Sequence, residues 1–150
     1  MPIDTVIQNL IADASDPTTF AHRQDEASHV LPTRCSGTVW PHNGCAIMQS
    51  VLLRHAGLTD LPYTCMALDL VNALKNRGWN RIEVGDQQPG DIGTTCGDVY
   101  HEGVDHVYLM LDCDENGMMT VADNQAPTPH SRPVAGNGTN FSPTTYFLRA

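Results

Sequence analysis

Residues 40–53 decide the fold of this chain. They read Trp40-Pro41-His42-Asn43-Gly44-Cys45-Ala46-Ile47-Met48-Gln49-Ser50-Val51-Leu52-Leu53. The segment 41–44 is turn-forming, and the apolar residues after it recur four positions apart, which predicts one face of an amphipathic helix. Gly57, just past this pattern, is the expected end of the helix.

Cys45 falls at the N-terminus of this predicted helix. Unpaired N–H groups and the positive end of the helix dipole favour an anion there, so a thiol at that position has a lowered pKa. Gly44 would let a substrate backbone come close. The alternative is that Cys45 only fills the core, as most free cysteines do. We take Cys45 as the candidate nucleophile.

The composition limits the classes of function. A chain of 150 residues with 41% apolar residues predicts one domain, 1–150, with an ordinary core. Its net charge of −9, from 17 acids and 8 bases, argues against partners such as nucleic acid or an anionic membrane. We find no apolar run of transmembrane length and no signal-peptide pattern at the N-terminus.

The cysteine count is odd. Five scattered cysteines do not suggest a full disulfide framework, and at least one thiol is expected to be free unless it pairs between chains. We therefore expect synthesis in a reducing cytosol, and structural roles for the four cysteines other than Cys45. They are Cys35, Cys65, Cys96 and Cys113.

Helices are expected first and strands afterwards, which is an α+β order. Residues 4–12 and 64–76 have helical patterns, whereas 13–44 are polar and are expected to be irregular. Strands are expected at 81–84, 91–94, 106–112, 118–123 and 145–149. Residues 114–117 form a hairpin turn, and 126–144 a long surface loop.

A nucleophilic cysteine needs a base, and among seven histidines His106 is distinctive because it opens a clear strand. The hairpin after it constrains its neighbours. A four-residue loop pairs Cys113 with Met118 and therefore His106 with Gln125, and a two-residue loop shifts this pairing by two residues.

In both of these registers Asp123 and Gln125 lie on the same face of the sheet as His106. Either side chain could accept the Nδ1–H of the imidazole. Asn124 would take that place only after an odd-numbered loop or a bulge. The alternative is that His106 caps a strand and Asp123 faces water.

The order of these parts resembles the NlpC/P60 and CHAP superfamily of papain-like cysteine peptidases and amidases, which mostly act on bacterial peptidoglycan. The resemblance covers residues 40–125: Cys45 at a helix start, the strand Pro89-Gly90-Asp91-Ile92, the His-Val-x-Leu strand at His106, and a hairpin ending in Asp123-Asn124-Gln125. In that comparison Asp123 and Gln125 match a Glu-x-Asn motif.

The sequence departs from this family at Asn43-Gly44-Cys45-Ala46, and the usual upstream tyrosine is absent. Trp40 or Asn43 would line that wall of the substrate site instead.

The resemblance implies a papain-like fold, with N-terminal helices packed on an antiparallel sheet. It also implies hydrolysis of peptidoglycan stem-peptide amides without a metal or other cofactor. Cys45 would attack the carbonyl, His106 would transfer the proton, and Asp123 or Gln125 would hold the imidazole. The backbone N–H of Cys45 would be one oxyanion donor and the Asn43 side chain the second.

Substrate carboxylates would be met by some of six cations: Arg34, Arg54, Lys75, Arg77, Arg81 and Arg132. The loops 97–105 and 126–144 would rim the groove. We expect a monomer made in the cytoplasm without a signal peptide. It would act in the periplasm or at the cell wall, as a secreted effector amidase or a phage-type lysin, and an immunity or inhibitor protein is an expected partner.

Three alternatives stay open. Two loose sets of residues are of zinc-ligand type, but neither has the spacing of a metal motif. A papain-like site also serves deamidases and acyltransferases that modify proteins, and a non-catalytic binding module could keep the same scaffold. The two sets are Cys35, His42, Cys45 and His55, and Cys96, His101 and His106.

Overall fold

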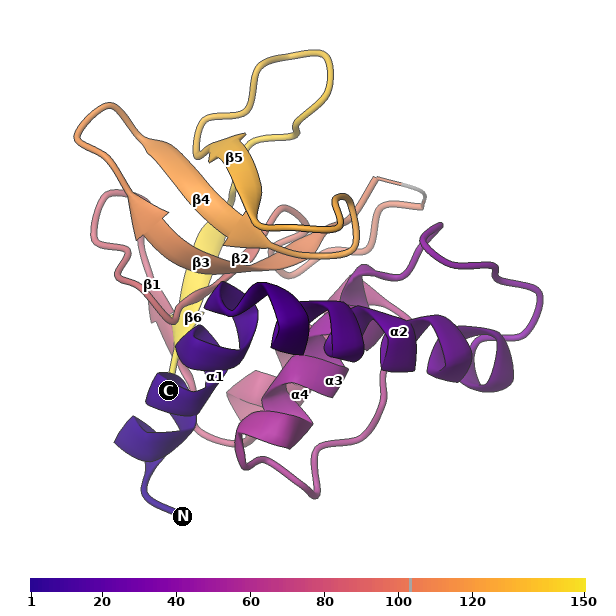
Figure 1. The fold of residues 1–150 in the computed structure, drawn as a ribbon. Coiled ribbons are helices and arrows are strands. Elements are labelled where there is room, and N and C mark those ends of the chain that lie inside the picture. Colours follow the sequence, from indigo (N-terminus) through magenta and orange to yellow (C-terminus); the bar gives the residue numbers. More distant parts are fainter. Residues whose placement is uncertain (103) are drawn as a thin grey trace.

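A computed structural model describes residues 1–102 and 104–150. In this part of the chain four helices precede a six-stranded antiparallel sheet, so the predicted α+β class is confirmed (Figure 1). The helices are α1 (Ile3–Ser15), α2 (Pro17–Arg34), α3 (Cys45–Ala56) and α4 (Ala67–Asn76). The strands are β1 (Asn80–Ile82), β2 (Ile92–Thr94), β3 (Val107–Cys113), β4 (Met118–Ala122), β5 (His130–Pro133) and β6 (Tyr146–Arg149).

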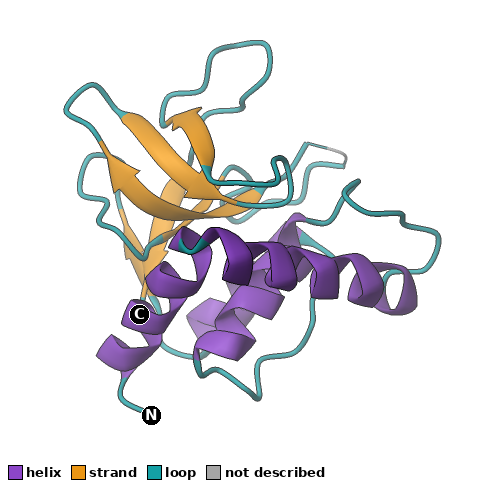
Figure 2. Cartoon of the chain, in the orientation of Figure 1, coloured by secondary structure: helices purple, strands orange, loops and turns teal. Residues whose placement is uncertain are grey.

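The strand order in the sheet is β1-β6-β2-β3-β4-β5, and the helices gather on one side of it (Figure 2). Apolar side chains of the sheet form two clusters, because successive residues of a strand point to opposite faces. One cluster, which includes Val107 and Leu109, joins the helices, and the other includes Tyr108 and Met110. None of the helices in the described residues has the length and apolar character needed to cross a membrane.

Helix α3 lies at the centre of the helical layer. It contacts α1, α2, α4 and β3, and all of its residues except Arg54 and His55 are buried. Its two buried polar side chains have partners: the Ser50 hydroxyl donates to the Ala46 carbonyl (2.8 Å) and Gln49 Nε2 donates to the Ala122 carbonyl (2.9 Å). The Gln49 bond joins α3 to the end of β4.

The prediction of an irregular segment at 13–44 is wrong, because α2 occupies most of it. Asp16 caps this helix by accepting a hydrogen bond from the Thr19 N–H (3.2 Å), and Pro17 stands at the first helical position, where a missing N–H costs nothing. Only Phe20, Ala27 and Leu31 are buried on it. Such a narrow apolar stripe gives little helical periodicity in the sequence.

The long surface loop expected at 126–144 is also partly wrong, since it contains β5. This strand pairs with β4 at the edge of the sheet, where Val121 lies opposite His130 and Met119 opposite Arg132. Its residues, His-Ser-Arg-Pro, carry no alternation of apolar and polar side chains. Each of the five predicted strands is present, with shifted ends.

The hairpin between β3 and β4 differs from both predicted registers near the turn. Cys113 pairs with Met119 instead of Met118, which corresponds to an odd-numbered loop. A β-bulge between Met110 and Asp112 then shifts the register back, so that Met110 pairs with Val121. Beyond the bulge the pairing is therefore that of the four-residue loop.

A disulfide joins Cys35, at the end of α2, to Cys65, before α4. The expectation of at least one free thiol agrees with Cys45, Cys96 and Cys113, which are unpaired in the structure. The scattered spacing of the cysteines gave no sign of this bridge. It connects the end of α2, the helix that sequence patterns missed, to the segment that enters α4.

Replacing Cys35 and Cys65 together with serine should lower the free energy of unfolding by about 3–4 kcal/mol, because the disulfide closes a 30-residue span in the unfolded chain. Urea denaturation without reductant measures this difference. Cys113→Ser, which removes a free thiol, is the control and should change the free energy by less than about 1 kcal/mol. Equal stability of the double variant and wild type would contradict the prediction.

Candidate active site

Cys45 is the first residue of α3, as the sequence predicts, and Gly44 is its N-cap. No side chain in the described residues caps this helix end, so its first N–H groups stay available. Gly44 does not provide the predicted open approach for a substrate backbone. A Cβ at this position would lie 2.9 Å from the Trp40 ring, so the glycine serves to let Trp40 pack beneath the helix start.

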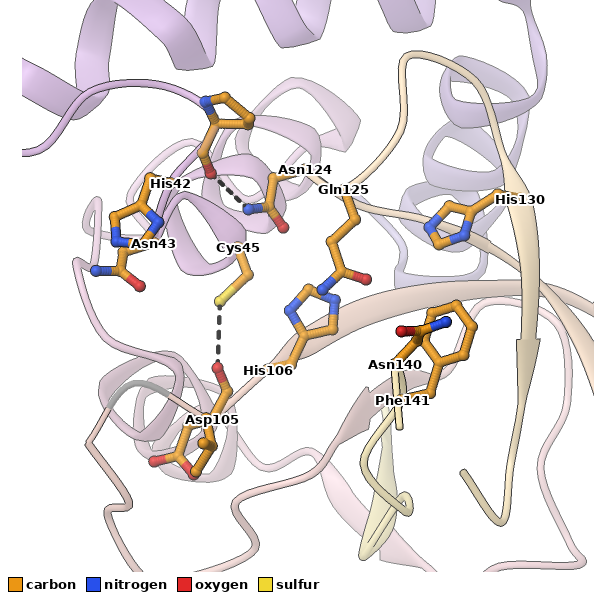
Figure 3. Close-up of a pocket in the computed structure, with 12 residues that line it drawn as sticks. His42, Asn43, Cys45, Asp105, His106, Asn124, Gln125, His130, Asn140 and Phe141 are labelled. Atoms are coloured by element: carbon orange, nitrogen blue, oxygen red, sulfur yellow. Dashed lines mark hydrogen bonds between the residues drawn. The ribbon is translucent and has the colours of Figure 1, made fainter. Parts of the chain in front are cut away.

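His106 and Asp123 meet where β3 begins and β4 ends. The His106 backbone N–H donates to Thr95 Oγ1 (2.9 Å), and its ring Nε2 lies 2.8 Å from Asp123 Oδ2. The predicted contact is therefore present, but through Nε2 instead of Nδ1. The other ring nitrogen is left for Cys45, which lies beside the imidazole (Figure 3).

The pKa values of Cys45, His106 and Asp123 are shifted more by the contacts among these side chains than by their burial. Burial raises the pKa of Cys45, but the hydrogen bond and charge of His106 lower it more, so the net pKa lies below the ordinary value. Burial lowers the pKa of His106, while hydrogen bonds with Asp123 and Cys45 raise it to about 9. Burial raises the pKa of Asp123, and hydrogen bonds from His106 and His130 bring it well below its usual range.

The arrangement therefore favours a thiolate, an imidazolium and a carboxylate together at neutral pH. The Cys45 sulfur also lies 4.0 Å from the Asp105 carbonyl oxygen, at the margin of a hydrogen bond. A thiolate beside an imidazolium is a nucleophile that needs no further activation near neutral pH.

The three residues after β4 have different positions, which separates the alternatives left by the sequence. The Asp123 side chain contacts His106, whereas the exposed Gln125 contributes its backbone N–H to Asp123 Oδ1 (2.9 Å). Asn124 Nδ2 donates to the Pro41 carbonyl (2.7 Å). Asn124 thus holds the loop before Cys45 against the sheet.

Sequence reasoning missed three contributors to this site. His130 Nε2 lies 2.8 Å from Asp123 Oδ1, on the carboxylate oxygen that His106 does not use. Gln24, on α2, donates to the carbonyls of Asp123 (3.1 Å) and Ala126 (2.7 Å). Gln49, the third, carried a usable signal, because it is a polar residue in an apolar helical stretch, four positions after Cys45.

Two clefts meet at Cys45, and both are also lined by Asn43 and Asp105. The larger cleft has a volume of about 760 Å³ and lies on the His106 side (Figure 3). The smaller one, of about 360 Å³, runs past the Cys35–Cys65 disulfide. Other residues lining the larger cleft include His42, Asn124, Gln125, His130, Asn140 and Phe141.

The loops expected to rim the groove do contribute to it. Residues of 97–105 line both clefts, and residues of 126–144 line the larger one, while Gly103 lies outside the described residues. Asn43 lines both clefts, as expected. Trp40 is half-buried and borders a separate hollow beside the loop, with Gln24 and Asn124, so it stands behind the cleft wall.

The six predicted cations lie elsewhere. Neither cleft has a Lys or Arg among its described lining residues. Arg34 and Arg54 lie over the Tyr63 ring, and Arg132 is buried between the rings of Tyr108 and Phe141. Arg77 bonds Asp60, and Lys75 and Arg81 lie beside Tyr146.

The two zinc-type sets do not assemble. Cys35 belongs to the disulfide and is not available as a thiolate ligand. Within residues 1–102 and 104–150, no group of three His, Cys, Asp or Glu side chains is arranged so that it could hold a metal ion.

Comparison of the chain with models of known protein families, with curated proteins and with solved structures gives no match.

The reactivity of Cys45 should report the charges of the site. At pH 6 iodoacetamide should alkylate Cys45 about tenfold or more faster than a small free thiol, because His106, with a pKa of about 9, stays protonated and stabilises the thiolate. Asp123→Asn should slow alkylation at pH 6, since its hydrogen bond raises the pKa of His106. Peptide mass spectrometry would measure the rate at Cys45 separately from Cys113.

His106→Ala should slow alkylation at pH 6 further than Asp123→Asn does. A Cys45 rate in the wild-type protein that rises only between pH 8 and 9, as for an ordinary thiol, would contradict the thiolate–imidazolium pair.

Proposed function

We propose that this protein is a cysteine hydrolase that cleaves amide bonds of bacterial peptidoglycan stem peptides. The observation that carries the reaction type is the alignment of Cys45, at a free helix N-terminus, with an imidazole whose far nitrogen is bonded to the buried Asp123. The resemblance to NlpC/P60 and CHAP enzymes, and to their papain-like fold, supplies the substrate class. The order of helix, strand and acid-bearing hairpin is consistent with it.

The reaction is an acyl transfer in two halves. Asp123 accepts from Nε2, so Nδ1 of His106 holds the proton that the Cys45 thiol has given up in the resting thiolate–imidazolium pair. The thiolate adds to the amide carbonyl, and the C–N bond then breaks as Nδ1–H gives its proton to the leaving nitrogen. Water, deprotonated by Nδ1, attacks the thioester, and the C–S bond then breaks, which releases the acid and restores the Cys45 thiolate beside the protonated His106.

Negative charge develops on the carbonyl oxygen during both additions. The backbone N–H of Cys45 has no acceptor within the helix and is the first oxyanion donor. The side chain of Asn43 is the candidate for the second, since it lines both clefts next to Cys45.

The position of His106 orients the substrate. The leaving nitrogen must lie near the imidazole that protonates it, so the amine part of the substrate occupies the larger cleft. The acyl part then occupies the smaller cleft, whose lining includes the carboxylate side chains of Glu102 and Asp105. With no Lys or Arg among the described lining residues, amide groups and backbone N–H groups would have to meet any substrate carboxylate.

The disulfide bears on where the protein acts. A bridge between Cys35 and Cys65 persists in oxidising surroundings, such as a bacterial periplasm or the cell exterior. It therefore supports action outside the cytosol, after export or lysis. The resemblance alone adds an immunity or inhibitor protein as a partner that would restrain the enzyme.

Wild-type protein should release new fragments from purified peptidoglycan, and their masses should identify the bond cleaved. Cys45→Ala should reduce this rate by about 10³-fold or more, because the covalent step is lost. Cys96→Ala, at another buried free thiol, is the matched control and should retain activity.

Full activity of Cys45→Ala would refute the mechanism. A second outcome is that peptidoglycans of several chemical types are cleaved neither by wild type nor by any variant, while Cys45 still reacts with iodoacetamide. That result would indicate that the substrate is a protein, as it is for papain-like deamidases and acyltransferases. An unreactive Cys45 without cleavage would indicate a binding module.

A further inference from the structure

Asp123 has two imidazole partners, and the mechanism above uses only one. His106 Nε2 lies 2.8 Å from Oδ2, and His130 Nε2 lies 2.8 Å from Oδ1. The carboxylate has no exposed surface, and the Gln125 backbone N–H also donates to Oδ1. Each oxygen therefore has a fixed donor, and the plane of the carboxylate is set from both sides.

Charge determines the direction of both bonds. With a lowered pKa, Asp123 is ionised and can only accept hydrogen bonds, so Nε2 carries the proton on both rings. For neutral His106 this leaves the lone pair on Nδ1, the nitrogen beside Cys45. The orientation of the Asp123 carboxylate thus selects the tautomer of the catalytic base.

We propose that His130 is a positioning residue, which holds the Asp123 carboxylate so that Oδ2 stays aligned with His106. This inference rests on the proposed cysteine chemistry but not on the identity of its substrate. Without the donor from His130, the carboxylate could turn about its Cβ–Cγ bond, because the Gln125 N–H alone would hold Oδ1. The imidazole would then lose both its tautomer and its angle toward Cys45.

The ring of His130 is itself held in place. It stacks on Phe141, with 6.3 Å between ring centroids and 28° between planes, and Phe141 rests on the buried Arg132. The pairing of His130 with Val121 sets the backbone beside β4. His130 therefore presents its N–H from a fixed position, which a water molecule in its place could not do.

Two substitutions separate the donor from the ring. His130→Phe keeps a ring that can stack on Phe141 but removes the N–H, whereas His130→Gln keeps an N–H donor and removes the ring. If the hydrogen bond positions Asp123, His130→Phe should lower kcat about 10- to 100-fold, the value of one hydrogen bond to a charged group, with KM changed less than about threefold. His130→Gln should recover most of kcat.

A second readout requires no substrate. The alkylation rate of Cys45 by iodoacetamide at pH 6 should fall in His130→Phe and recover in His130→Gln, because thiolate formation depends on a correctly held His106. His22→Phe, at an exposed histidine of α2, is the matched control and should equal wild type. Thermal unfolding of each variant verifies that the protein is folded.

The outcomes are distinct. Equal alkylation rates of His130→Phe and wild type would overturn the proposal, and so would a His130→Gln protein as slow as His130→Phe, since the donor would then be irrelevant. If peptidoglycan is not cleaved by any of the proteins, the proposed function fails, but the alkylation rates still decide the role of His130.

Discussion

The burial of one carboxylate constrains this structure more than any other single feature. Asp123 has no exposed surface and carries a negative charge, and an ionised group without partners in such a place would cost several kcal/mol. Its partners come from separate elements: His106 before β3, His130 on β5, and the Gln125 N–H in the turn after β4. Gln24, on α2, holds the carbonyl of the same residue. The elements must therefore assemble together for the charge to be buried, so the requirement for folding and the requirement for an aligned base are met by the same contacts.

The nucleophile reaches this carboxylate through a second buried contact. Cys45 begins a helix that the core surrounds, and Gln49, one turn later, donates to the carbonyl of Ala122, the residue before Asp123. At the other side, Asn124 donates to the carbonyl of Pro41, in the loop that enters the helix. Helix and hairpin are thus joined directly on both sides of the acid. Because packed interiors resist small displacements, the distance between sulfur and imidazole is set by rigid elements rather than by the exposed loops that line the clefts.

The sequence predicts those parts of the site that have a periodic pattern. The apolar residues after Cys45 recur at helical spacing, and the strand that starts beside His106 is followed by a strong turn, so both could be located from sequence. The helix at 17–34 buries too few apolar residues to give a comparable pattern, although Asp16 and Pro17 were a valid start signal. The strand at 130–133 is short, polar and at the sheet edge, where local sequence has little influence and pairing with β4 determines the conformation. For the same reason a histidine in this strand could not be connected with the acid.

The register of the hairpin explains why the acid was located correctly although the turn was not. Side-chain direction in a strand depends only on whether an even or an odd number of residues has been inserted. The odd-numbered turn shifts the pairing of the two strands by one residue, and the bulge shifts it back by one. The two shifts cancel, so Asp123 lies on the face of the sheet that His106 occupies. The same rule applies across the other edge of β4, where His130 lies opposite Val121, two residues before Asp123 and on the same face. Both histidines are therefore diagonal neighbours of one carboxylate on adjacent strands. Once β5 is placed in the sheet, alternation alone brings the second imidazole to the acid.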